Sequence, residues 1–446
     1  MKSAASARGV QAWAPGRLGL MALWFACGLP VGTAAQAVAD QASPEAPATE
    51  ESKSPIITPD LFKPGLFDNP YAFPDFALDR KLLPELNTRF LTIIPDLELI
   101  FDWSGFRQDA TNVGQVGAQS NGFEVRSASS DISGEIGQKR LLSYKIGLEY
   151  NGFDVNSKGN FTISDFAVSF RIPKLRAKVS VGQMREDFGY EVIASTASMS
   201  QSERTLSPFS SPVNAGVKVI HQFGHDDRMT LTYGLFKNSW GDGDGKIEFS
   251  GRLTGLVIDQ PGQRRFLHLG VSVREFGSDG TLSYKGTPGS HIADDFVDTG
   301  QFAASGATHI GLEVQYADGP WSILAEHATA YVRSDATGNP RFNAFYVLGS
   351  WTLTGESRPY DRTQGITRRI VPKGRWGAIE FVGRYSKVDL DGGSVRGGRY
   401  DRIEIGGNWW ATTRWKLGLL AGRVWLDRFG VQGRSDTLLT RVQWVY

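Results

Sequence analysis

The sequence predicts an all-β protein, a single transmembrane antiparallel β-barrel of about 16 strands with infolded loops. Three observations lead to this fold class: an export signal, runs that alternate apolar and polar residues, and connections of alternating length. Hydrophobic residues make up 41% of the 446, which excludes a largely disordered chain. The formal net charge of +1 leaves no basic footprint, so we expect no nucleic-acid partner.

The export signal is predicted at residues 1–37. Lys2 and Arg17 belong to a basic start, an apolar run follows at 18–31, and the small residues at 33–39 contain two A-x-A cleavage sites. The apolar run is shorter than the about 20 residues that a spanning helix needs. We therefore expect a cleaved signal peptide rather than a membrane anchor.

Residues 38–88 are expected to form a proline-rich periplasmic tail or linker. The segment 43–59 is rich in Pro, Glu, Ala and Ser, a composition typical of flexible chain. Prolines and phenylalanines are then interspersed between 59 and 84, which leaves open a segment that packs against the rest. The barrel domain is predicted to occupy residues 89–446.

The barrel strands are runs of about 11 to 17 residues with period-two polarity, separated by turn residues. In one such run Leu142 and Ile146 share a face, while Lys145 and Glu149 share the other. Sixteen runs start near residues 90, 121, 141, 161, 174, 213, 227, 246, 264, 307, 320, 341, 374, 399, 414 and 435. Each strand with its connection then has about 22 residues, enough for the about 9–11 that cross the hydrocarbon.

The connections support the same fold. Those after even-numbered strands are mostly short, such as 138–140 and 318–320, and several of the others are long. Short periplasmic turns and long outer loops are typical of an outer-membrane barrel. A soluble β-sandwich of this size would need several domains with linkers, and a solenoid would need a fixed-period repeat; the sequence shows neither. We expect Trp444 and Tyr446, in the alternating C-terminal run, to be recognised by the barrel-assembly machinery.

Motifs that carry catalytic chemistry are missing from the sequence. The six histidines occur singly, and neither an H-E-x-x-H nor a G-x-S-x-G motif is present. The one cysteine, Cys27, lies in the predicted signal peptide. We therefore expect no enzyme, no cofactor and no metal site.

Several segments resemble the phosphate-selective porin O and P family. They are FYVLGSWTLTGESRPY at 345–360, GAIEFVGRYS at 377–386 and Asn408-Trp409-Trp410, with weaker matches at 202–204 and 298–313. The resemblance extends over about residues 120 to 446. It implies a sixteen-stranded trimeric porin of a Gram-negative outer membrane, in which the third and fifth outer loops and one long periplasmic turn fold into the lumen. The strand count places these three segments at 186–212, 277–306 and 356–373.

The charge on these segments bears on selectivity. Residues 186–212 and 277–306 each carry a net charge of −3, and residues 356–373 carry +3. Phosphate-selective members are expected to have lysines clustered on the third loop, but 186–212 contains none. The acidic lumen candidates of the two outer loops are Glu186, Asp187, Glu191, Glu203, Asp294, Asp295 and Asp298. We expect them to hydrogen-bond to lumen cations or to loop backbone rather than to bind a metal ion.

Cationic side chains on the predicted lumen faces and infolded segments are the candidates for selectivity. Individually each is a solvated residue or an ion-pair partner, and as a set they are expected to shape conductance through a transverse field. The set comprises Lys174, Arg176, Lys178, Arg204, Arg358, Arg362, Arg384, Arg402, Arg414, Lys416 and Arg441.

The predicted function is a water-filled passive diffusion channel for small hydrophilic solutes and ions. An anion or phosphate preference follows from the cations, and a preference for another small solute follows from the acidic loops. The alternative is a structural or receptor barrel plugged by its own loops. The expected partners are outer-membrane lipid and lipopolysaccharide, small ions or oxyanions and, through the family resemblance, two further copies in a homotrimer.

Overall fold

The computed structural model describes residues 86–151, 160–237 and 245–446. The predicted signal peptide and all but the last three residues of the predicted tail lie outside this part. Among the described residues, no helix combines the length and the apolar character needed to cross a membrane.

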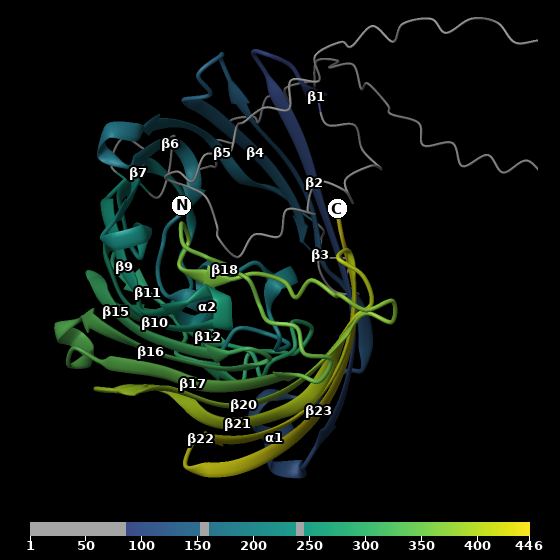
Figure 1. Cartoon of the computed structure of the whole chain (residues 1–446). Coiled ribbons are helices and arrows are strands. Elements are labelled where there is room, and N and C mark those ends of the chain that lie inside the picture. The colour runs from purple at the N-terminus through teal and green to yellow at the C-terminus, as the bar shows by residue number, and fades with distance from the viewer. Residues whose placement is uncertain (1–85, 152–159, 238–244) are drawn as a thin grey trace, which may run out of the picture. The chain divides into compact units, whose positions relative to one another are not determined.

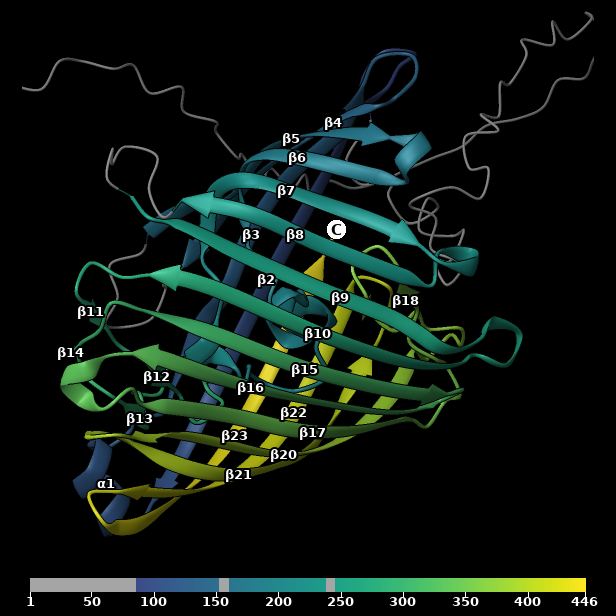
Figure 2. The same cartoon turned by 90° about the vertical axis from the view of Figure 1, so that its left-hand side faces the viewer.

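Sixteen long antiparallel strands form a closed barrel in the described part of the chain, which confirms the predicted fold class (Figures 1 and 2). Consecutive strands pair with each other, and β2 closes the barrel because it pairs with β3 on one side and β23 on the other. The strands are β2 (Thr92–Gln108), β3 (Gly122–Ile136), β4 (Leu142–Asn151), β5 (Asn160–Ile172), β6 (Ala177–Arg185), β7 (Val213–Phe223), β8 (Met229–Lys237), β9 (Ile247–Gln260), β10 (Arg265–Gly277), β15 (Gly306–Asp318), β16 (Trp321–Arg333), β17 (Arg341–Thr352), β20 (Ala378–Gly392), β21 (Val395–Trp410), β22 (Trp415–Arg428) and β23 (Val431–Val445).

Shorter elements lie at the start of the described chain and between the long strands. One of them, β1 (Leu86–Asn87), pairs with the beginning of β2, so the described fold starts slightly before the predicted boundary at residue 89. The others are α1 (Ala110–Val116), α2 (Tyr190–Ile193), the pairs β11 (Thr281–Leu282) with β14 (Phe302–Ala303), β12 (Lys285–Gly286) with β13 (Val297–Asp298) and β18 (Tyr360–Asp361) with β19 (Ile366–Thr367), and the 3₁₀ turns 173–175, 196–198, 207–209, 225–227, 261–263 and 335–337.

The period-two alternation of the sequence determines which side chains face outward. On β4 and β5, Ile146, Leu148, Phe166 and Phe170 are all exposed, as expected for a lipid-facing surface. Aromatic residues gather where strands meet the short turns: the indoles of Trp321 and Trp351 stack with their centroids 5.0 Å apart, and Phe381 continues the row. Such aromatic rows are typical of membrane interfaces.

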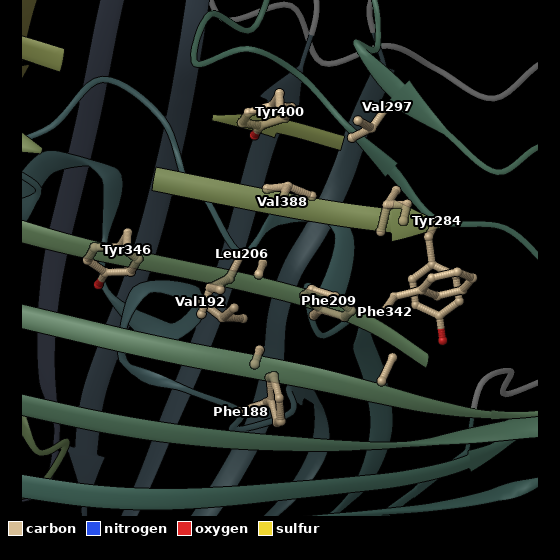
Figure 3. Packing of buried hydrophobic residues seen from close by; sticks show 14 of the residues in the cluster. Phe188, Val192, Leu206, Phe209, Tyr284, Val297, Phe342, Tyr346, Val388 and Tyr400 are labelled. Carbon is tan, nitrogen blue, oxygen red and sulfur yellow. The ribbon is translucent and has the colours of Figure 1, made fainter. Parts of the chain in front are cut away.

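The predicted infolded segments are present, the third outer loop at its predicted bounds and the other two with slightly shifted bounds. The third outer loop is residues 186–212, the fifth outer loop is residues 278–305, and the long periplasmic turn is residues 353–377. Figure 1 shows α2, β12 and β18 of these segments inside the barrel beside β15 to β21. Their apolar side chains form a buried cluster against that wall, to which Phe188 and Phe209 of the third loop and Tyr346 and Phe342 of β17 belong (Figure 3).

Candidate functional site

The interior of the barrel is covered unevenly. On β15 to β23, the inward-facing charged side chains are buried beneath the infolded segments; they include Glu313, Glu326, Glu380, Glu404 and Lys416. A cavity of about 30 Å³ between the third outer loop and this wall has room for about one water molecule. This side of the lumen is therefore packed rather than open.

The opposite wall, formed by β3 to β7, keeps several of its inward-facing charges partly exposed. The side chains of Lys145 and Arg171 are 45% and 38% exposed, and Asp131, Glu135 and Asp165 are 23%, 28% and 24% exposed. The pleat aims these residues inward because their neighbours, such as Ile146 and Phe170, face lipid. The open part of the lumen accordingly runs along β3 to β7.

A basic cluster lies on β5 to β7. Arg171 is directly opposite Lys178 in the ladder, and Lys218 is opposite Ser180, two residues further along β6. Both of these cations act electrostatically on Lys178, and the effect of Lys218 is the larger. Counter-charges are nearby: Glu135 lies 3.4 Å from Arg171, and Asp187 lies 3.2 Å from Lys218. We call Arg171, Lys178 and Lys218 the basic cluster.

An acidic centre lies next to it on β3 to β5. The Lys145 ammonium is 3.0 Å from Asp131 and 2.7 Å from Asp165, so two carboxylates share one cation. Asp96 of β2 lies within electrostatic range of both Asp131 and Lys145. Sequence reasoning placed Lys178 among the lumen cations and Lys145 on the polar face of its strand, but did not use Arg171, Lys218 or these carboxylates. The alternation with apolar neighbours was the signal that could have found them.

The third outer loop is held by its backbone carbonyls. Five of them accept hydrogen bonds from inward-facing or infolded side chains over 2.7–2.9 Å. The donor and acceptor pairs are Gln443 to Ala197, Arg358 to Ser198, Lys416 to Met199, Asn408 to Ser200 and Arg384 to Glu203. Carbonyls satisfied in this way fix an irregular segment that has no strand partner. The loop is thus a fixed wall of the lumen.

Glu203 connects the third outer loop to both sides of the barrel closure. Its carboxylate lies 2.6 Å from Arg126 of β3 and 3.0 Å from Arg441 of β23, and Arg441 is also 2.6 Å from Asp102 of β2. Burial alone would raise the pKa of the Glu203 carboxyl, but the charges and hydrogen bonds of Arg126 and Arg441 outweigh it and hold that pKa well below its usual range. We call these four residues the closure network.

The other sequence-predicted residues of this loop are also paired. Glu191 lies 3.2 Å from Arg384, and burial nevertheless raises the pKa of its carboxyl. Arg204 donates to the carbonyls of Glu191 and Ala194 over 2.9 and 2.6 Å.

Two further wall contacts bind the ends of the loop. Glu186 lies 2.7 Å from Arg274 of β10. Arg402 pairs with Glu404, which in turn accepts a hydrogen bond from the Ser202 hydroxyl.

The long periplasmic turn is anchored at two places. Arg358 lies 2.8 Å from Glu380 and 5.3 Å from the ring centre of Trp410, whose other cationic neighbour, Lys416, is at 4.9 Å. Arg362 lies 2.6 Å from Asp259. Both arginines therefore fix the turn to the wall instead of pointing into open lumen.

A buried chain of hydrogen bonds holds the middle of the same turn. His268 Nε2 lies 2.8 Å from Glu313, and Nδ1 lies 2.6 Å from the hydroxyl of Tyr360. A carboxylate only accepts, so Nε2 carries the proton and the Tyr360 hydroxyl donates to Nδ1. Arg252 donates to the carbonyls of Gln364 and Gly365 beside it.

The acidic residues of the fifth outer loop have cationic or amide partners. Lys285 lies 3.3 Å from Asp298 and 3.7 Å from Asp295, and Asp294 exchanges two hydrogen bonds with Gln119. In the ranges that the structure describes, no group of three or more His, Cys, Asp or Glu residues is arranged to hold a metal ion.

Three of the predicted lumen cations lie elsewhere. Lys174 and Arg176 are exposed in the turn between β5 and β6, because Pro173 ends the strand and Arg176 adopts a left-handed conformation with φ 48°. Arg414 lies in the turn before β22, over the ring of Tyr446. In the sequence the period-two pattern begins within these turns, but β6 and β22 start only at Ala177 and Trp415. Lys178 is the one member of the predicted selectivity set that lies in a strand of the partly exposed wall.

A closed sixteen-stranded barrel with infolded loops and a charged, partly exposed lumen defines the porin class of Gram-negative outer-membrane proteins. The chain belongs to the phosphate-selective porin O and P family, whose model matches residues 99–443.

Two solved porin structures share the fold at low identity. The anion-selective porin from Comamonas acidovorans is 12% identical with a TM-score of 0.51, and the match covers 80% of this chain and 100% of that one. The outer membrane channel DcaP of Acinetobacter baumannii is 10% identical with a TM-score of 0.51, over 82% and 100%.

A curated relative matches a smaller part. An uncharacterized protein of Caulobacter vibrioides is 29% identical over 177 residues, which cover 37% of this chain and 36% of that protein. The chain thus matches about a third of that relative's length.

Proposed function

We propose that the barrel is a passive, water-filled diffusion channel whose open path follows β3 to β7 and favours small anions. The observation that carries this proposal is the uneven exposure of inward-facing charges. Arg171 and Lys145 remain reachable by solvent, whereas Lys416 on the opposite wall is 1% exposed. A solute that crosses the barrel therefore meets β3 to β7 and the surface of the infolded segments.

The charges along this path act as a filter without a tight site. The basic cluster attracts anions, and Lys145 balances one of the two carboxylates of the acidic centre beside it. Each exposed charge interacts weakly through water, so solutes are sorted by sign and size and still leave quickly. The name of the Comamonas acidovorans porin, which is anion-selective, agrees with this preference.

The buried cations have a different role in this proposal. Arg358, Arg384, Arg402 and Lys416, together with the closure network, position the third outer loop and the long periplasmic turn. They set the width of the path rather than contact the solute. We assign direct contact to the basic cluster.

The remaining expectations are part of the same proposal. We propose a channel rather than an enzyme, built as a homotrimer in outer-membrane lipid and lipopolysaccharide. Residues 1–37 would be removed as a signal peptide and 38–88 would form a periplasmic tail. Trp444 and Tyr446 would be recognised by the barrel-assembly machinery, and small ions or oxyanions would be the solutes.

The test is single-channel current of the purified protein in a planar bilayer under a KCl gradient, followed by added phosphate. We expect a reversal potential on the anion side. Block by phosphate would narrow the solute to phosphate-like oxyanions, whereas the same sign without block would indicate general anion selectivity. A reversal potential on the cation side would overturn the anion preference, and a closed protein would indicate the plugged structural or receptor barrel.

A further inference from the structure

The tip of the fifth outer loop crosses to the far side of its own strands. The loop leaves β10 and returns at β15; of its paired segments, β13 lies against β20 and β21, and β12 lies against the 3₁₀ turn 207–209 of the third loop. The tip then reaches β2 and β3: the Ser290 hydroxyl lies 2.8 Å from that of Ser104, and His291 Nδ1 lies 2.6 Å from Glu124. The tip is thereby attached beside the proposed path, which begins at β3.

The two contacts differ in chemical character. Ser290 and Ser104 are both buried and uncharged. Glu124 is buried too, and its second carboxylate oxygen has no hydrogen-bond partner, while the His291 side chain is 42% exposed. A buried carboxylate that depends on one exposed imidazole is stabilised far more by a charged imidazole than by a neutral one.

We propose that His291 and Glu124 form a pH-dependent latch that keeps the tip of the fifth outer loop out of the open path along β3 to β7. When the imidazole is charged, the tip stays bound to β3 and the path is open. When the imidazole is neutral, the tip detaches intermittently and enters the mouth of the path, which interrupts the current.

The groups around His291 determine whether the latch forms at low or at high pH. The hydrogen bond to Glu124 raises the pKa of His291 above the ordinary value of about 6.5, against burial and against Arg126 of the same strand; Glu203 of the third loop adds to the rise. The neighbouring elements also contribute the neutral Ser104 and Gln119, and the Arg402 guanidinium of β21 lies beside Gly289, two residues before His291. A raised pKa means that the latch is fully formed below about pH 6.5 and is lost as the pH rises through the raised value.

The test rests on the proposed channel and compares single-channel records at pH 6 and pH 9. We expect brief closures to become severalfold more frequent at pH 9 in the native protein. In His291→Gln they should be frequent at both pH values. The matched control is His225→Gln, because His225 lies 2.7 Å from Asp226 in a short turn at the other end of the barrel. This variant should keep the native pH dependence.

A cross-link provides a second variant that does not alter the titrating pair. The double variant Ser104→Cys, Ser290→Cys places two thiols where the hydroxyls are 2.8 Å apart, which suits a disulfide. After oxidation the closures at pH 9 should disappear, and reduction should restore them. Equal closure frequencies at pH 6 and 9 in the native protein, or closures that persist in the cross-linked form, would overturn the latch.

If the protein conducts no current, the proposed function is contradicted but the latch is not, and a chemical readout then tests the latch. The alkylation rate of Ser290→Cys, divided by its rate in the His291→Gln background, should rise from pH 6 to pH 9. A constant ratio would show that the tip does not detach.

Discussion

The guanidinium of Arg441, on the last strand of the barrel, lies 3.0 Å from the carboxylate of Glu203 on the third outer loop. The same guanidinium pairs with Asp102 on the first long strand, and Glu203 also pairs with Arg126 on the second. An infolded loop thus bridges the place where the barrel closes. The loop that narrows the lumen and the closure of the sheet are held by the same four side chains.

The first prediction concerns the stability that Glu203 provides. Glu203→Gln leaves Arg126 without its carboxylate and Arg441 with Asp102 alone, both largely buried. Removing one member of a buried pair costs about 3 kcal/mol or more, so the thermal unfolding transition in detergent should move to lower temperature. Asp279→Asn is the control, since that carboxylate is 84% exposed and 3.6 Å from Lys246. An unchanged transition in Glu203→Gln would show that the network does not stabilise the closure.

The second prediction is the acid dependence of the same network. The pKa of Glu203 is depressed, so its contribution is present above the ordinary carboxyl value of about 4.3 and is lost as the pH falls through the depressed value. The difference in unfolding temperature between native protein and Glu203→Gln should be constant from pH 7 to pH 5 and shrink only in stronger acid. A difference that vanishes already at pH 5 would contradict the assignment.

The third prediction tests the basic cluster. Lys178→Gln combined with Lys218→Gln should move the reversal potential in a KCl gradient toward zero, with an about twofold to fivefold loss of anion preference. Charges that act through water contribute on the order of 1 kcal/mol or less, which sets this size. Lys387→Gln is a control with the same chemical change, because Lys387 is exposed on the outward face of β20. Identical selectivity in the double variant and the control would show that the basic cluster does not line the ion path.

The fourth prediction concerns Lys145, the cation shared by the two carboxylates of the acidic centre, whose removal should favour cations. Lys145→Gln exposes Asp131 and Asp165 without their shared cation. The channel should then become more permeable to cations, and divalent cations should slow the current. A reversal potential equal to that of the native protein would place the acidic centre away from the ion path.

The fifth prediction concerns the long periplasmic turn. Tyr360→Phe removes the donor to His268 and leaves a buried ring nitrogen unsatisfied, at a cost of about 1–3 kcal/mol. The turn should loosen, which would appear as increased noise in the open-channel current and a lower unfolding temperature. Tyr331→Phe, the same change at an exposed position on the outward face of β16, should affect neither quantity.

Much of the architecture followed from local sequence pattern. Sixteen runs of alternating polarity correspond to the sixteen long strands, because the pleat gives every second residue to lipid and lipid accepts only apolar side chains. The third outer loop was placed at its observed bounds, 186–212, since the pattern stops where pairing stops. The start of the strand after Pro173 was placed too early, at Lys174, because the alternation begins there in the sequence, whereas the 3₁₀ turn 173–175 delays β6 until Ala177.

The sequence by itself determined the barrel, its strand order and which face of each strand looks inward. Only the tertiary structure decided which inward-facing cations meet solvent. Lys178 and Lys416 both follow the same alternating pattern, yet Lys416 donates to the carbonyl of Met199, more than two hundred residues earlier in the chain. Alternation is a local property of a strand, whereas burial depends on where an infolded loop from a distant part of the chain comes to lie.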